Sequence, residues 1–109
     1  MRKALAIALW FLGVEAGATP ATQVAWAAHT LSRIERGDPK RGQELASACA
    51  ACHGGEGIST DPAFPHLAGQ LATYLYRQLR DYKDGSRQNP LMQEFAATLS
   101  DQDMADLAA

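Results

Sequence analysis

The chain has 109 residues, of which 47% are hydrophobic, so it can build one small domain and hardly a second. Its formal net charge is -2, and without residues 1–18 it keeps eight basic and eleven acidic residues. This acidic balance excludes a nucleic-acid-binding protein.

The first 18 residues have the pattern of a secretory signal peptide. Arg2 and Lys3 give a basic start, an apolar run follows over residues 4–14, and an A-x-A pattern ends at Ala18. The run is shorter than the roughly 20 residues of a membrane span, although an uncleaved anchor stays open. We expect export and cleavage after Ala18, with a second A-x-A site that ends at Ala27 as the alternative.

Residues 19–36 would then form an N-terminal extension of the mature chain. A weak helical periodicity runs through Val24, Ala28, Leu31 and Ile34. The pattern favours a short extra helix, and a tail that orders on binding or a part of the signal remain as alternatives.

The next segment is predicted to be a helix that starts at Asp38 and ends before Gly54. Asp38 has the side chain of an N-cap, and Pro39 suits the first helical position. Gly42 and Ala46 share one face, where their small size lets another helix approach closely. A loop follows that Pro62 and Pro65 punctuate.

The C-terminal part of the chain is predicted to contain two further helices. Apolar residues at helical spacing place one over residues 71–84, with Gly85 as its stop. After a polar loop through residues 85–92, Ser100 and Asp103 signal the start of the last helix. Its buried stripe would consist of Leu99, Met104 and Leu107. No segment alternates with period two, so the fold class is all-α.

The two cysteines are the chain's most informative residues. Cys49 and Cys52 are followed directly by His53, in the pattern C-x-x-C-H. A disulfide, a redox dithiol and a zinc site all begin with closely spaced cysteines, but zinc needs four ligands and only His29 and His66 remain to complete such a site. In an exported chain this motif indicates covalent attachment of one haem c.

Three stretches carry a resemblance to a known family: "GDPKRGQELASACAACHGGEG", "FPHLAGQLATYLYRQLRDYKDGSRQNPLM" and "LSDQDMADLAA". They resemble a class I c-type cytochrome of bacteria, and in particular one haem domain of the cytochrome c4 family. The resemblance implies a class I cytochrome c fold over residues 37–109, with helices packed around the haem. It also implies that the domain is truncated at its C-terminal helix, because relatives continue with aromatic residues that pack against the glycine of the first helix.

The resemblance also implies roles for individual residues. Cys49 and Cys52 would form the thioether links, His53 would be the proximal iron ligand and Met92 the distal one. The carbonyl oxygen of Pro65 would accept a hydrogen bond from the far nitrogen of His53. Leu67 would pack on the haem.

Other residues of the right chemistry have a simpler interpretation. Met104 is expected in the core rather than on the iron, and His29 and His66 at the surface rather than in a bis-histidine site. Aromatic residues are expected to pack in the core or at the haem edge: Phe64, Tyr74, Tyr76 and Tyr82. Four basic residues are expected on a solvated face, with haem propionates or a partner as alternatives: Arg77, Arg80, Lys83 and Arg87.

An iron held by a histidine and a methionine has no free position, which favours electron transfer over catalysis. We therefore expect a periplasmic one-electron carrier, not an enzyme, with redox partners such as a membrane quinol-oxidising complex, a terminal oxidase or reductase, or a periplasmic dehydrogenase. No nucleic-acid partner and no stable membrane insertion of the mature chain are expected. The alternatives are the cytochrome subunit of a periplasmic dehydrogenase and a ligand-sensing or peroxidatic haem protein.

Overall fold

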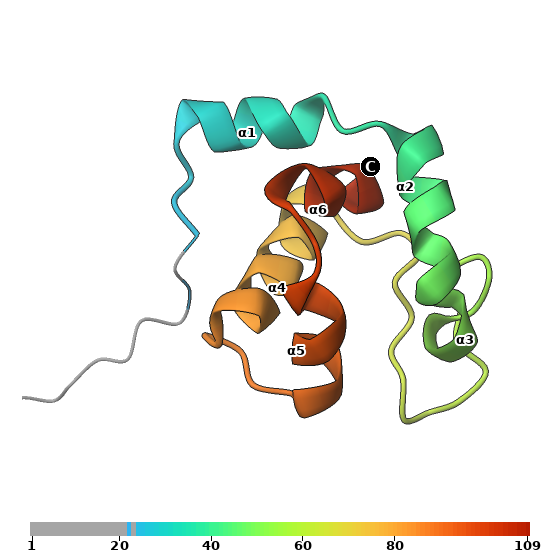
Figure 1. Ribbon diagram of the computed structural model, residues 1–109. Coiled ribbons are helices and arrows are strands. Elements are labelled where there is room, and N and C mark those ends of the chain that lie inside the picture. The colour runs from blue at the N-terminus through green and yellow to red at the C-terminus, as the bar shows by residue number, and fades with distance from the viewer. Residues whose placement is uncertain (1–21, 23) are drawn as a thin grey trace, which may run out of the picture.

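The computed structural model describes residue 22 and residues 24–109, so the predicted signal peptide lies outside the described residues. Within them the chain is helical and contains no strand, which confirms the all-α class (Figure 1). The elements in chain order are α1 (Ala28–Glu35), α2 (Pro39–Leu45), the 3-10 turn η1 (Ala46–Ala48), α3 (Ala50–His53), α4 (Ala72–Asp84), α5 (Pro90–Ala97) and α6 (Asp101–Ala108). None of the described helices is long and apolar enough to cross a membrane.

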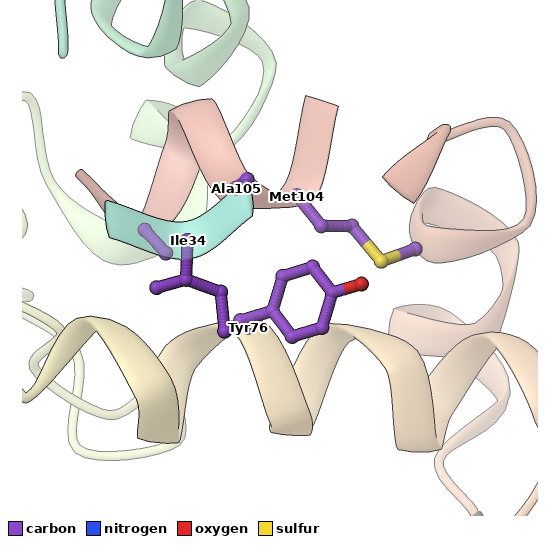
Figure 2. Packing of buried hydrophobic residues seen from close by; sticks show 5 residues of the cluster. Ile34, Tyr76, Met104 and Ala105 are labelled. Atoms are coloured by element: carbon purple, nitrogen blue, oxygen red, sulfur yellow. The ribbon is translucent and has the colours of Figure 1, made fainter. Parts of the chain in front are cut away.

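The core is built from α1, α4 and α6. Ile34 of α1, Tyr76 of α4 and Met104 of α6 pack together with Ala105 and Ala108, as Figure 2 shows for the first four. Met104 is fully buried there, as expected for a core residue. Leu99 packs against this cluster, but Leu107 faces a separate cavity, so the predicted stripe of the last helix is divided between two environments.

The crossing of α2 and α6 is the tightest contact between helices. A Cβ atom on Gly42 would lie 1.9 Å from the carbonyl oxygen of Asp106, so only glycine allows this approach. The predicted close approach at Gly42 is therefore confirmed, and α6 makes it with its own backbone.

Polar contacts reinforce the same crossing. Arg41 donates to Asp106 and to Asp103, each at 2.6 Å, and the backbone N–H of Asp38 donates to Asp106 Oδ1 at 2.9 Å. Asp106 is 2% exposed, and the hydrogen bond from Asp38, followed by those from Gln102 and Arg41, lowers the pKa of its carboxyl group. The last helix is thus tied to the start of α2 by a buried, fully partnered carboxylate.

Helix ends follow the signals in the sequence. The Asp38 side chain accepts hydrogen bonds from the N–H groups of Lys40 and Arg41, and Gly85 ends α4 in the left-handed region at φ 85°. Ser100 and Asp103 form a complete capping box at the start of α6. The helix expected to run on to Gly54 is instead interrupted by η1, where the backbone tightens before Cys49.

One helix contradicts the sequence analysis. Met92 was expected in a loop, but it lies in the first turn of α5. Asn89 caps this helix by accepting hydrogen bonds from the N–H groups of Leu91 and Met92, and Pro90 takes the first position. The Asn-Pro pair is the same start signal as Asp38-Pro39, and it predicts a helix as well as a turn.

The N-terminal extension contacts the rest of the domain through Thr22, Val24 and α1. The Thr22 hydroxyl donates to the buried carboxylate of Asp81 in α4, at 2.5 Å, and Val24 packs against the core cluster. Thr30 and Ile34 of α1 are buried. The extra helix is therefore confirmed for residues 28–35, and residues 19–21 and 23 lie outside the described part of the chain.

The basic residues of α4 are paired rather than simply solvated. Arg80 binds Asp101 at 2.6 Å, Arg77 lies 3.6 Å from Asp81, and Lys83 donates to the carbonyl oxygen of Leu99. The side chains of Arg77 and Arg80 keep 37% and 31% of their surface exposed, and Lys83 is exposed, so this face stays partly solvated as expected. The contacts with Asp101 and Leu99 come from a later part of the chain, which helical periodicity alone does not reveal.

Candidate functional site

A cavity of about 770 Å³ lies between the Cys-x-x-Cys-His segment and helices α4, α5 and α6. It brings together all six residues that the sequence singled out: Cys49, Cys52, His53, Pro65, Leu67 and Met92. Most of its other lining side chains are apolar, and among its lining residues only Glu56 and Arg87 are charged. Such a cavity suits a large, flat, mostly apolar group.

Cys49 directly precedes α3 and Cys52 lies within it; both are half-buried, and no disulfide joins them. Burial, with a smaller contribution from the neighbouring Cys52, raises the pKa of the Cys49 thiol. The described residues contain no cluster of three or more His, Cys, Asp or Glu side chains arranged to hold a metal ion. The zinc site considered above is therefore not assembled in this part of the chain.

His53 is the buried polar residue of the cavity wall, with 8% of its surface exposed. Its Nδ1 lies 3.0 Å from the carbonyl oxygen of Pro65, the contact expected from the sequence. Because a carbonyl can only accept, Nδ1 is the donor in this contact, and in the neutral ring the lone pair is then on Nε2. Phe64 holds the ring from the side in an edge-on contact, with ring centroids 6.3 Å apart.

Met92 reaches the cavity from α5, where the Asn89 cap fixes the first turn. Met104 does not line the cavity. His29 lies exposed on α1 and also takes no part. His66 is exposed at the cavity wall, and its Nδ1 accepts a hydrogen bond from the backbone N–H of Ser59 at 2.8 Å.

The aromatic residues divide between core and cavity. Tyr76 is in the core, while Phe64, Tyr74 and Tyr82 line the cavity. Arg87 lines it as well, stacked over the Tyr82 ring at 4.8 Å and bonded to Gln78. Sequence reasoning missed the cavity positions of Leu91 and Phe95, because it did not recognise α5, on which both lie.

These residues fit a covalently attached haem. Two thiols three positions apart can react with its two vinyl groups, and His53 offers a lone pair on a ring whose orientation the Pro65 carbonyl fixes. The apolar cavity provides the surroundings that the macrocycle needs.

Comparisons with known proteins agree with this arrangement. The chain matches the family Cytochrome c over residues 39–109, and it belongs to that family. It is 51% identical over 73 residues to cytochrome c4 of Pseudomonas aeruginosa, a match that covers 67% of this chain and 36% of the relative. It is 43% identical over 76 residues to cytochrome c-554(548) of Halomonas halodenitrificans, covering 67% of this chain and 92% of that protein.

A third relative differs in its description. The chain is 49% identical over 65 residues to a thiosulfate dehydrogenase electron acceptor of Stutzerimonas stutzeri, covering 59% of this chain and 30% of the relative. The chain thus spans about a third of the length of this protein and of the cytochrome c4 relative.

Family and motif together define the chemistry. The chain is a cytochrome c domain of the class I type, and it is similar to cytochrome c4. Its cofactor is one haem c, bound covalently through the Cys-x-x-Cys-His segment.

Proposed function

We propose that this chain is a periplasmic one-electron carrier whose haem iron is held by His53 and Met92. The observation that carries the proposal is the shared cavity, which α3 lines with Cys52 and His53 and α5 lines with Met92. When bound, the haem supplies reversible one-electron exchange at its iron.

The protein side chains have separate tasks in this proposal. Cys49 Sγ and Cys52 Sγ hold the macrocycle, and the Pro65 carbonyl keeps the proton of His53 on Nδ1 so that Nε2 is free to bind iron. Met92 would offer the iron a soft, neutral thioether as a second protein ligand. Leu67 and its apolar neighbours exclude water from the cavity.

The attachment is tested on protein matured in cells that carry cytochrome c maturation machinery. After extraction with acidic acetone the haem should stay with the polypeptide, because thioether bonds survive this treatment. Cys52→Ala should retain a single weaker link, whereas His53→Ala should lose the native low-spin spectrum. Haem that leaves with the solvent would disprove covalent attachment.

The Met92 assignment has its own optical test. The oxidised protein should show the weak near-infrared band of a sulfur-to-iron charge transfer, and the reduced protein should bind carbon monoxide poorly. Met92→Ala should abolish the band and open the iron to added ligands. Met104→Leu should change neither, because it is a volume-conserving exchange in the core. Prompt carbon monoxide binding by the wild type would favour the ligand-sensing or peroxidatic alternative.

Export is part of the same proposal, and the described N-terminal contacts bear on the cleavage site. The Thr22 hydroxyl binds Asp81, Val24 packs on the core, and the Ala27 carbonyl accepts the first hydrogen bonds of α1. Cleavage after Ala27 would remove Thr22 and Val24 and leave Asp81 without its hydroxyl partner. These contacts favour cleavage after Ala18, so N-terminal sequencing of the periplasmic protein should start at Thr19.

The physiological partners follow from this role. We propose exchange of electrons with respiratory components: a membrane quinol-oxidising complex and a terminal oxidase or reductase. The similarity to a thiosulfate dehydrogenase electron acceptor favours a periplasmic dehydrogenase as a second candidate partner. Stopped-flow reduction of the ferric protein separates the two: the first predicts rapid reduction by quinol-oxidising membranes, the second by a purified periplasmic dehydrogenase.

A further inference from the structure

Ser59 is, with His53, one of only two buried residues between positions 46 and 71, with 8% of its surface exposed. Its hydroxyl oxygen lies 3.2 Å from the Cys52 carbonyl and 2.9 Å from the Asp61 carbonyl, and it accepts a hydrogen bond from the Asp61 N–H. The Cys52 carbonyl belongs to the last turn of α3, where no helical N–H is available to it. The hydroxyl has one proton, and the Asp61 carbonyl already accepts a hydrogen bond from the Phe64 N–H. We therefore assign the Ser59 proton to the Cys52 carbonyl, so that Ser59 supplies the donor that the end of α3 lacks.

His66 fixes the other side of Ser59. The Ser59 backbone N–H donates to His66 Nδ1 at 2.8 Å. His66 follows Pro65 directly, and Pro65 is the residue whose carbonyl holds the ring of His53. The position of that carbonyl is thus tied through His66 to Ser59.

Together these contacts form a closed cycle of residues that includes His53, here called the contact cycle. From the His53 ring the path runs through the Pro65 carbonyl, along the chain to His66, across to Ser59, and through its hydroxyl to Cys52, which precedes His53. Both the backbone of His53 and the acceptor of its Nδ1 proton are therefore braced by the same buried serine. Such a contact cycle holds a donor and an acceptor at a fixed separation better than either contact alone.

We propose that Ser59 and His66 are positioning residues that set the strength of the hydrogen bond between His53 Nδ1 and the Pro65 carbonyl, and through it the reduction potential. The inference rests on the proposed function, in which His53 is the proximal iron ligand. Neither residue is proposed as an iron ligand, because Ser59 does not line the cavity and His66 Nδ1 accepts a hydrogen bond from the Ser59 N–H.

The expected direction follows from the chemistry of imidazole. A strong bond from Nδ1 to a carbonyl draws the proton away from the ring and makes Nε2 a better electron donor. A better donor favours ferric over ferrous iron. Loss of a contact from the contact cycle should therefore weaken the hydrogen bond between His53 Nδ1 and the Pro65 carbonyl. The equilibrium between ferric and ferrous iron should then shift toward the ferrous form.

The experiment measures the ferrous to ferric ratio of the mature holoprotein at a fixed solution potential. Ser59→Ala and His66→Leu should each raise this ratio roughly two- to tenfold, the effect of losing about one neutral hydrogen bond. His66→Asn should restore the wild-type ratio, because the Asn side-chain oxygen can accept in place of Nδ1. Ser47→Ala and His29→Leu are matched controls on exposed residues that do not line the cavity, and they should leave it unchanged.

The outcomes separate this inference from the function beneath it. A wild type without the sulfur-to-iron band would overturn the ligand assignment itself. With that band present, ratios in Ser59→Ala and His66→Leu equal to those of the controls would overturn the inference, even if urea denaturation shows lower stability. A changed ferrous to ferric ratio in only one of the two variants would also overturn the inference, because the contact cycle requires both residues. A His66→Asn variant that does not keep the wild-type ratio would overturn it as well.

Discussion

Two regions of the molecule are held together in different ways. The helical region, α1 with α4, α5 and α6, has a core of buried apolar side chains led by Met104 and Ala105, which are fully buried. The motif region, residues 46–71, contains only two buried residues, and both of them are polar: His53 and Ser59. Backbone and side-chain hydrogen bonds order the motif region, and apolar side chains such as Phe64 and Leu67 line the cavity, while Ile58 and Leu71 are exposed.

The difference shows which region depends on the cofactor. The helical region buries apolar surface within the protein, which is the main source of folding free energy. The motif region has no such source of its own, so the haem must provide the apolar surface against which it packs. Helix α2 joins the regions, because it precedes the motif and crosses α6 at Gly42.

The strongest way to break this arrangement is to separate α2 from α6. Gly42→Val should destabilise the protein by about 3 kcal/mol or prevent folding, because the new side chain overlaps the Asp106 backbone and the helices must move apart. Urea denaturation followed by circular dichroism measures the loss. Gly55→Ala is the matched control in the motif region, where an added Cβ meets nothing within 4 Å. Equal stability of the two variants would show that the crossing does not join the regions.

The carboxylate of Asp106 is the main polar contact between α2 and α6, so its removal tests how the two regions are joined. Asp106→Ala should cost about 2 kcal/mol, because the Asp38 N–H and Arg41 lose an ionised acceptor. Asp106→Asn keeps an acceptor for Asp38 and should cost less. Calorimetry of the three proteins at neutral pH gives these values, and a larger loss in Asp106→Asn than in Asp106→Ala would contradict the assigned contacts.

Because Asp106 is bonded as a carboxylate, the stability of the folded protein should depend on pH. Hydrogen bonds lower the folded-state pKa values of Asp106 and Asp103 below the ordinary value of 3.8. A depressed folded pKa contributes stability that is present above the unfolded pKa and is lost as the pH falls below it. The melting temperature should therefore fall between about pH 4 and pH 2, and Asp106→Asn should flatten part of this slope. An unchanged slope would remove Asp106 from the account.

The smallest expected effect concerns the start of α5. Asn89→Ala should cost about 1 kcal/mol, since the N–H groups of Leu91 and Met92 lose their cap. The near-infrared band should also disappear at a lower denaturant concentration, because Met92 lies in the uncapped turn. Asn89→Ser retains a capping oxygen and should behave as the wild type. Similar behaviour of the Ala and Ser variants would show that the cap does not hold Met92.

Local signals allowed much of the fold to be predicted. Asp38 with Pro39, Gly85, and Ser100 with Asp103 mark helix ends that the structure contains, because caps depend on neighbours in sequence. Helix α5 was missed because the Asn89-Pro90 pair is compatible with both a turn and a helix start.

The candidate site also has features that could be predicted from local sequence and features that could not. Six residues that line the cavity could be predicted from the motif and the resemblance, and the contact between His53 and Pro65 is present, whereas the cavity positions of Leu91 and Phe95 were missed with α5. The bond from Ser59 to His66 could not be predicted, because it joins loop residues whose meeting depends on the folded path and not on a periodic pattern.

The pairing of α2 with α6 also affects the order in which the domain folds and the haem is attached. Arg41 binds Asp103 and Asp106, which lie 62 and 65 positions further along the chain, so the domain cannot close until α6 has been synthesised. Until then Cys49 and Cys52 belong to an open segment whose thiols enzymes can reach. The late arrival of α6 thus leaves an interval for covalent attachment, after export and before closure places the two sulfur atoms in the cavity wall.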